Sequence, residues 1–124
     1  MIRPKVLIVE DTELNRDLLT QLLEDDYFVV TAVDGADGIE AARRERPDIV
    51  LMDLSLPVMN GWEATQAIRA DPELRDTIVI AVTAHAMREE RERARTAGVD
   101  DYLTKPIDED LLFAMLRSHL GERR

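Results

Sequence analysis

The feature that most constrains the fold of this chain is an alternation of short apolar runs with longer amphipathic stretches. The runs are rich in Val, Ile and Leu and cover residues 6–9, 28–32, 49–52 and 78–82, with a weaker one near Tyr102 and Leu103. Near-continuous apolarity over about five residues is typical of a parallel β-strand that helices cover on both faces. The pattern therefore predicts an α/β fold, (βα)5, with one doubly wound, five-stranded parallel sheet.

Apolar residues between the runs recur at helical spacing. They are Leu14, Leu18, Leu19, Leu22 and Leu23, then Ala64, Ala67 and Ile68, and finally Leu112, Met115, Leu116 and His119. Asn60 and Glu63 have the spacing of a capping box at a helix N-terminus, and Gly121 is typical of a helix terminator. The 124 residues contain no repeat, low-complexity tract or Pro/Gly/Ser-rich linker, so residues 1–124 are predicted to form a single domain.

Charge and composition exclude several classes of protein. A formal net charge of −10 argues against general binding to nucleic acids or anionic membranes, and favours a basic partner surface or a metal cation. The absence of cysteine excludes a disulfide framework, a zinc-thiolate site and a thiol nucleophile, so a cytoplasmic location is expected. No segment has the roughly 20 apolar residues of a membrane span, and the first apolar run is too short for a signal peptide.

Asp53 follows four apolar residues directly, although an ionised carboxylate beside a core is costly without a partner. Ligands of doubly wound sheets lie beyond the carboxyl ends of the strands. The polar residues at the other strand ends are Glu10 and Asp11, Thr83, and Lys105. These side chains are therefore predicted to converge with Asp53 at one edge of the sheet.

Three carboxylates at close range repel one another, and a hard divalent cation between them would offset that repulsion. Mg²⁺ prefers carboxylate and carbonyl oxygens, keeps several waters and accepts a phosphate oxygen as a further ligand. Lys105 would supply a positive charge, and Thr83 a hydroxyl donor, to other phosphate oxygens. Asp53 is then interpreted as a nucleophile that becomes an aspartyl phosphate, in a site where positioning and electrostatics supply most of the catalysis.

Four motifs occur in order: KVLIVED from Lys5, LMDLSLPVMNG around Asp53, AVTAHA around Thr83 and DYLTKP around Lys105. Together and at this spacing they resemble the receiver domains of two-component response regulators, from Lys5 to the last helix. The phrases DTELNRDLL and AVTAHAM are most similar to stand-alone cell-cycle receivers and to the receivers of hybrid kinases. Thr12 departs from that subgroup, which often has Asn at this position.

The resemblance implies a flavodoxin-like fold and Mg²⁺-dependent phosphorylation of Asp53 from a phosphohistidine on a histidine kinase or phosphotransfer protein. It implies metal contacts from Asp11, Asp53 and the main-chain carbonyl of Ser55, with Glu10 acting directly or through water. Such a protein is a phosphoacceptor switch rather than a turnover enzyme, and a monomer or weak dimer is expected.

The resemblance also assigns a switch pair, Thr83 and Tyr102, in which the hydroxyl moves toward the phosphoryl group and the aromatic ring turns inward. This change would remodel the surface of the fourth helix, fifth strand and fifth helix, where such proteins meet a downstream protein. His85 occupies a family position that tunes hydrolysis of the acyl phosphate. The peptide bond before Pro106 is often cis in the family.

Several of these residues also have plain structural interpretations. Asp11 and Lys105 could form an ion pair without a metal, and Glu10 could favour the following helix N-terminus through its charge. Thr83 could be a strand-end hydroxyl that the backbone satisfies, and Tyr102 could serve core packing.

Four further features have default structural interpretations. Trp62 is predicted to pack against a neighbour, His119 to be a partly buried residue with a polar partner, and His85 could be an exposed loop residue. The segment 88–95 has opposite charges four residues apart, so a solvated helix face is predicted and a docking face is the secondary interpretation.

Two rival activities are disfavoured by single positions. A flavodoxin would bind flavin phosphate with Ser, Thr and Gly donors, whereas the first loop here begins with Glu10, Asp11 and Thr12. A haloacid-dehalogenase-like phosphatase needs a second carboxylate two residues after its nucleophile, where this chain has Ser55. An unphosphorylated interaction module is disfavoured because the full set of acids, hydroxyl and lysine is present. No nucleic-acid or membrane partner is expected.

Overall fold

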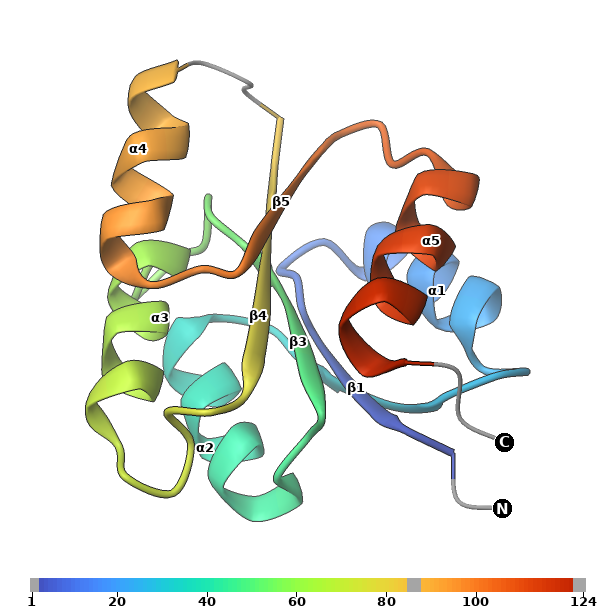
Figure 1. Cartoon of the computed structure of the whole chain (residues 1–124), viewed down its shortest axis with the longest axis horizontal. Helices are drawn as coiled ribbons and strands as arrows, with labels where there is room; N and C mark the ends of the chain where they lie inside the picture. The colour runs from blue at the N-terminus through green and yellow to red at the C-terminus, as the bar shows by residue number, and fades with distance from the viewer. Residues whose placement is uncertain (1–2, 85–87, 122–124) are drawn as a thin grey trace.

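The computed structural model describes residues 3–84 and 88–121, and it confirms the predicted alternation of strands and helices. In chain order the elements are β1 (Lys5–Val9), α1 (Glu13–Leu23), β2 (Phe28–Ala32), α2 (Gly35–Glu45), β3 (Ile49–Asp53), α3 (Gly61–Ala70), β4 (Ile78–Thr83), α4 (Arg88–Ala97), β5 (Asp101–Thr104) and α5 (Glu109–Leu120). All strand pairings are parallel, in the order β2-β1-β3-β4-β5. Figure 1 shows α1 and α5 on one face of the sheet and α2, α3 and α4 on the other, which is the flavodoxin-like arrangement.

The sheet separates two apolar cores because the side chains of a strand alternate between its faces. On β1, Val6 and Ile8 join the cluster that includes residues of α1 and α5, whereas Leu7 and Val9 join the cluster that includes residues of α2 and α3. All four side chains are at most 1% exposed. Burial on both faces explains why this strand is an uninterrupted apolar run in the sequence.

Two strands extend one residue beyond their apolar runs, and the added residue is polar in each. β3 includes Asp53, which is in register with Val82, and β4 includes Thr83, which is in register with Thr104. Both polar residues are therefore positioned by the hydrogen-bonded sheet rather than by a loop.

The helix boundaries that the sequence predicted are confirmed. The Asn60 side chain accepts a hydrogen bond from the Glu63 N–H at 2.9 Å, and the Glu63 carboxylate accepts one from the Asn60 N–H at 3.3 Å. This reciprocal capping box begins α3. Gly121 ends α5 with a φ of 73°, a left-handed conformation that suits glycine.

The apolar repeat of α1 is only partly buried. Leu19 and Leu23 lie in the core, whereas Leu14 is 65% exposed and Leu18 is 55% exposed. The repeat correctly predicted the helix, but it is wider than the face that packs on the sheet. Within the described ranges, no helix combines the length and apolarity that a membrane crossing requires.

The loop between β3 and α3 lies close against the end of β3. The Gly61 N–H donates to the Leu54 carbonyl at 3.2 Å, and the Leu54 N–H donates to the Val82 carbonyl at 3.0 Å. A Cβ atom at position 61 would overlap the Asp53 carbonyl oxygen and lie 2.7 Å from the Leu54 Cα. Glycine thus allows the start of α3 to sit directly beside Asp53.

Candidate functional site

Side chains from separate strands meet at the carboxyl edge of the sheet, as predicted. Glu10 follows β1, Asp53 ends β3, and Thr83 ends β4. Lys105 follows β5, and its N–H donates to the Thr83 carbonyl at 2.7 Å. The bond between Lys105 and Pro106 is cis, as the resemblance implied.

The Lys105 ammonium joins two buried carboxylates. Its Nζ lies 2.8 Å from Glu10 Oε1 and 3.1 Å from Asp53 Oδ2, and these acidic residues are 2% and 4% exposed. The second oxygen of each carboxylate accepts a backbone N–H. Ser55 donates to Asp53 Oδ1 at 2.9 Å, and Thr12 donates to Glu10 Oε2 at 3.0 Å. Every oxygen of both carboxylates thus has a donor, which fixes the orientation of each side chain.

Burial and charge shift the pKa values of the two carboxyl groups in opposite directions. Burial is the largest effect on Asp53 and raises its pKa; the Ser55 N–H opposes this, the Glu10 charge adds to it, and the net pKa is raised. Burial also acts to raise the pKa of Glu10, but hydrogen bonds from Lys105 and the Thr12 N–H outweigh it, so that pKa is lowered. Burial alone would lower the pKa of Lys105, but its bonds to the carboxylates raise it. The ammonium therefore stays charged, and Asp53 is the less stabilised anion.

Asp11 completes an acidic cluster at this edge. Glu10, Asp11 and Asp53 each offer one carboxylate oxygen, and these oxygens all lie within 4.8 Å of one another. Glu10 and Asp53 are buried, whereas Asp11 is exposed. Three acids facing one ammonium leave an excess of negative charge, which a divalent cation would balance. Closely spaced carboxylate oxygens are the ligands of hard cations, so the donor set fits Mg²⁺.

The structure decides two of the alternative interpretations. Among the described residues, the Lys105 ammonium pairs with Glu10 and Asp53, so the simple ion pair between Asp11 and Lys105 is wrong. Glu10 does contact the backbone at the start of α1, because it accepts the Thr12 N–H. Glu10 therefore has both roles: it binds the backbone at the start of α1, and it belongs to the acidic cluster.

Thr83 and Tyr102 contact each other. The Thr83 side chain is 2% exposed and hydrogen-bonds to the Tyr102 phenol. Burial raises the pKa of Tyr102, and the bond to Thr83 partly opposes this rise. The Arg91 guanidinium of α4 lies 5.3 Å from the centroid of the Tyr102 ring. Tyr102 also packs against the core cluster that contains Leu54 and Ala81, so it has the structural role that the sequence allowed and in addition links the carboxyl edge of the sheet to α4.

Trp62 packs as predicted. It lies against the cluster of Leu54, Ala81 and Ala94, and the Arg93 guanidinium lies 4.0 Å from its ring centroid. His85 lies outside the described residues, so its role stays a prediction.

Two further structural predictions are confirmed. His119 Nε2 lies 2.9 Å from Asp101 Oδ2, so this histidine has a polar partner on the apolar side of α5. Arg88 and Glu92 form an exposed ion pair at 3.4 Å along α4. Such a pair is typical of a solvated helix face.

Sequence reasoning missed one contact that supports the acidic cluster. Arg16 of α1 donates from its guanidinium to the Glu10 carbonyl at 2.8 Å. Arg16 lies one turn into α1, among other polar residues, and nothing in the sequence distinguishes it from them.

A cavity of about 770 Å³ opens beside the carboxylates, between α1 and the segment after β5. Its apolar lining includes Leu18 and Leu22 of α1, and Pro106 and Ile107 after β5. Glu10 and Lys105 also line it, so the cavity is continuous with the charged cluster.

Comparison with known proteins defines the class to which this fold and cluster belong. Residues 6–117 match the family model of the response regulator receiver domain, so the chain belongs to that family and is a receiver domain of two-component phosphorelay signalling. It is 42% identical over 118 residues to the polar-differentiation response regulator DivK of Brucella anthropi, an alignment that covers 94% of this chain and 96% of that protein.

Solved structures support the same class. The receiver domain of the sensor histidine kinase PA1611 from Pseudomonas aeruginosa PAO1 has a TM-score of 0.89 and 36% identity, over 97% of this chain and 99% of that one. That structure holds a magnesium ion coordinated in its active site cleft. The chemotaxis protein CheY4 of Vibrio cholerae has a TM-score of 0.89 and 29% identity, over 94% of this chain and 98% of that one.

Proposed function

We propose that this receiver accepts one phosphoryl group on Asp53, from a phosphohistidine of a histidine kinase or phosphotransfer protein, and acts as a switch rather than a turnover enzyme. The observation that carries the proposal is the contact of the buried Asp53 carboxylate with Lys105 at 3.1 Å, inside a cluster of three acids. A buried carboxylate with a raised pKa and a single shared counter-charge is poorly stabilised at rest. Its conversion to an acyl phosphate would supply phosphoryl oxygens for Lys105 and Thr83 to bind.

The transfer is a displacement at phosphorus. An oxygen of Asp53 forms the new O–P bond while the N–P bond of the donor breaks, and the donor imidazole keeps that electron pair and takes a proton from solvent. Lys105 stays protonated because its pKa is raised, so it offers a full positive charge to a phosphoryl oxygen throughout. The Ser55 N–H holds Asp53 Oδ1 in place, at 2.9 Å, while the bond forms.

The residues that would hold Mg²⁺ are Asp11, Asp53 and the main-chain carbonyl of Ser55, with Glu10 acting directly or through water. When bound, the ion would offset the charge of the phosphoryl oxygens and of the clustered carboxylates. The close spacing of the acidic oxygens supports this assignment, and so does the magnesium ion in the similar receiver of the kinase PA1611.

The donor is proposed to dock over α1. A phosphohistidine must reach Asp53 from the open edge of the sheet, and the apolar cavity lined by Leu18 and Ile107 lies at that edge. Leu14 and Leu18 are large apolar residues that the fold leaves exposed nearby. Contact with a helix of the donor would bury them.

The signal is proposed to leave through Thr83. Its hydroxyl has one proton and two lone pairs, so it can donate to a phosphoryl oxygen while it accepts from the Tyr102 phenol. A movement of Thr83 toward the phosphoryl group would then draw Tyr102 inward and change the surface of α4, β5 and α5. A downstream protein would read that change.

Incubation with acetyl phosphate and Mg²⁺, followed by intact-mass measurement, tests the proposal. One phosphoryl group should be added to the parent, and none to Asp53→Asn or to the parent without Mg²⁺. Thr83→Ala should still gain the phosphoryl group but lose most of the phosphorylation-dependent binding to its partner. Modification that persists in Asp53→Asn would place the acceptor elsewhere, and steady hydrolysis of an added phosphomonoester would show a phosphatase instead.

A further inference from the structure

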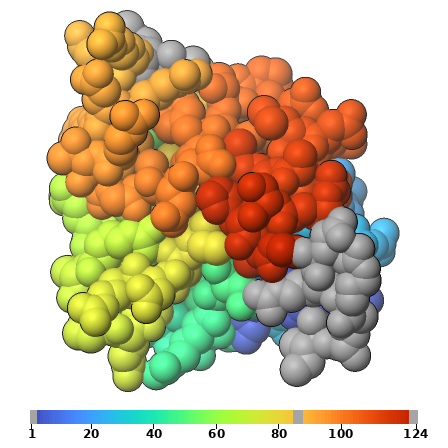
Figure 2. Space-filling model, viewed as in Figure 1, coloured from blue at the N-terminus to red at the C-terminus, as the bar shows by residue number. Residues whose placement is uncertain are grey.

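A second recess lies on the face formed by α4 and β5, away from the acidic cluster. It has a volume of about 300 Å³. The residues that line it are Arg91, Arg95, Val99, Asp100, Asp101 and Tyr102. Figure 2 shows this face toward the viewer, with α4, β5 and α5 side by side in orange to red.

Two guanidinium groups dominate one wall of this groove. Arg91 and Arg95 are four residues apart on α4, and both are exposed. Like charges at this spacing lie on one helix face and destabilise it unless an anion lies between them. In residues 3–84 and 88–121, the ion pair recorded for α4 joins Arg88 to Glu92, and no carboxylate pairs with Arg91 or Arg95.

The two aspartates of the groove are directed to other partners. Asp100 Oδ2 accepts from the Arg69 guanidinium at 2.6 Å and from the Val79 N–H at 2.8 Å. Asp101 Oδ2 lies 2.9 Å from His119 Nε2. The Arg69 guanidinium therefore offsets the charge of Asp100, and Asp101 is held by hydrogen bonds to His119 and to the Tyr102 N–H. Neither aspartate pairs with the arginine wall in the described part of the chain.

Tyr102 connects this groove to the phosphorylation site. Its ring lines the groove and lies under the Arg91 guanidinium, at 5.3 Å from the ring centroid. Its phenol hydrogen-bonds to Thr83, the last residue of β4. A shift of the Tyr102 ring would therefore change the position of the ring against which the Arg91 guanidinium packs.

We propose that this groove binds a short acidic segment of the downstream protein, whose carboxylates pair with Arg91 and Arg95. Arginine binds carboxylates through two parallel hydrogen bonds, which favours an acidic peptide that can enter a recess of this size. The net charge of −10 does not prevent such contact, because charges further away than about 8 Å are largely screened at physiological salt. The link from Tyr102 to phosphorylation rests on the proposed function, whereas the binding of the acidic segment does not.

The test is an NMR titration of the parent with a synthetic Glu-Gly-Glu-Gly-Glu-Gly peptide, up to millimolar concentration, and with its Gln-Gly counterpart. The amide signals of Val99 and Tyr102 should shift with the glutamate peptide and not with the glutamine peptide. The double variant Arg91→Gln/Arg95→Gln should bind about ten-fold more weakly, from two ion pairs of roughly 0.7 kcal/mol each.

Arg93→Gln is the matched control. Like each single variant, Arg91→Gln or Arg95→Gln, it removes one positive charge from the same helix, but Arg93 lies over the Trp62 ring at 4.0 Å and does not line the groove. Equal loss of affinity in Arg93→Gln and in the single groove variants would reduce the effect to general charge and overturn the proposal. Absence of shifts at Val99 and Tyr102 would overturn it as well.

Size-exclusion chromatography of the same variants tests a different occupant. A dimer of the parent that the double variant abolishes, without any peptide binding, would assign the groove to a second copy and overturn the acidic-segment proposal.

Intact mass after acetyl phosphate treatment is measured in parallel. Phosphorylation without selective peptide binding rejects the groove alone, and selective peptide binding without phosphorylation rejects the proposed function alone.

Discussion

Replacing Asp53 with asparagine should stabilise the metal-free protein, although it removes a buried hydrogen-bonded charge. The ionised Asp53 faces Glu10 and Asp11 within 4.8 Å, and each such pair repels by about 3.5 kcal/mol at an effective dielectric of ~20. The two pairs together repel by about 7 kcal/mol. The attraction of Asp53 to Lys105 at 3.1 Å offsets about 5 kcal/mol of this repulsion at the same dielectric. Asparagine keeps an oxygen for the Ser55 N–H. The expected gain in the free energy of unfolding is therefore about 1 to 2 kcal/mol in Asp53→Asn.

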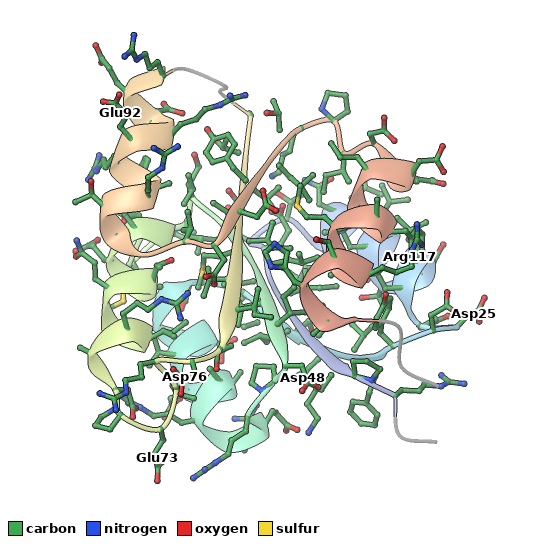
Figure 3. The ribbon with its side chains drawn as sticks, viewed as in Figure 1. Asp25, Asp48, Glu73, Asp76, Glu92 and Arg117 are labelled. Atoms are coloured by element: carbon green, nitrogen blue, oxygen red, sulfur yellow. The ribbon has the colours of Figure 1, made fainter. Side chains whose placement is uncertain are left out.

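The assay is urea unfolding of both proteins with a chelator and again with Mg²⁺. At a Mg²⁺ concentration ten times its dissociation constant, the parent should gain about 1.4 kcal/mol, while Asp53→Asn gains less because it has lost a ligand. The control is Asp76→Asn, which removes the same charge at the opposite end of the sheet, before β4 (Figure 3). It should change stability little and respond to Mg²⁺ like the parent.

The sign of the pH dependence follows from the raised pKa of Asp53. The folded state binds this proton more tightly than the unfolded state, whose carboxyl has its ordinary pKa of 3.8. The corresponding stabilisation is complete below that value and is lost as pH rises through the raised, folded-state pKa. The advantage of Asp53→Asn over the metal-free parent should thus be largest at neutral pH and shrink as pH falls toward 3.8. A destabilised Asp53→Asn at neutral pH, with a parent that ignores Mg²⁺, would refute both the repulsion and the metal site.

Three further predictions concern the framework around the site. Gly61→Ala should cost more than about 2 kcal/mol by urea unfolding and slow phosphorylation by acetyl phosphate, because the new Cβ would lie 2.7 Å from the Leu54 Cα. Val58→Gly should raise the free energy of unfolding by about 1 kcal/mol, because Val58 is β-branched, 87% exposed and held at a φ of 66°. The control Val33→Gly, at an exposed position without a positive φ, should show no such gain. Arg69→Gln should lose about 2 to 4 kcal/mol while leaving phosphorylation intact, since its guanidinium donates to three carbonyls and one carboxylate far from the acids.

The sequence predicted β1, β3 and β4 well because these strands are buried on both faces, and their continuous apolar runs are visible without knowledge of their neighbours. The edge strands β2 and β5 are more exposed, and the run of β5 is correspondingly weaker. It predicted the second helix only through the alternation, because α2 buries small residues such as Gly35, Gly38 and Ala41 that leave no apolar stripe. The convergence of Glu10 with Lys105 followed from their places at the carboxyl ends of predicted parallel strands.

Which acid pairs with Lys105 could not be predicted in the same way. That outcome depends on the Thr12 N–H, which turns Glu10 inward, whereas Asp11 stays exposed. The contact between Arg91 and Tyr102 was equally hidden, because it depends on how α4 sits against β5. Pairings of this kind come from tertiary geometry rather than from residue order.

The two edges of the sheet divide stability from function. At the carboxyl edge, Asp53 lies close to the like charges of Glu10 and Asp11. At the amino edge, polar groups pair across segments. The Lys5 N–H donates to Asp48 at 2.7 Å, and Arg69 donates to Asp100 at 2.6 Å. Arg69 also donates to a carbonyl before β4 and to one after α4. These charged hydrogen bonds are half-buried or exposed, and they join segments that are distant in the sequence, so they help to hold the strands in register. Under the proposed function, a phosphoryl group or a cation that relieves the repulsion at the carboxyl edge would move Thr83 and α4 without loosening the sheet, because the anchoring contacts lie at the far end of the same strands.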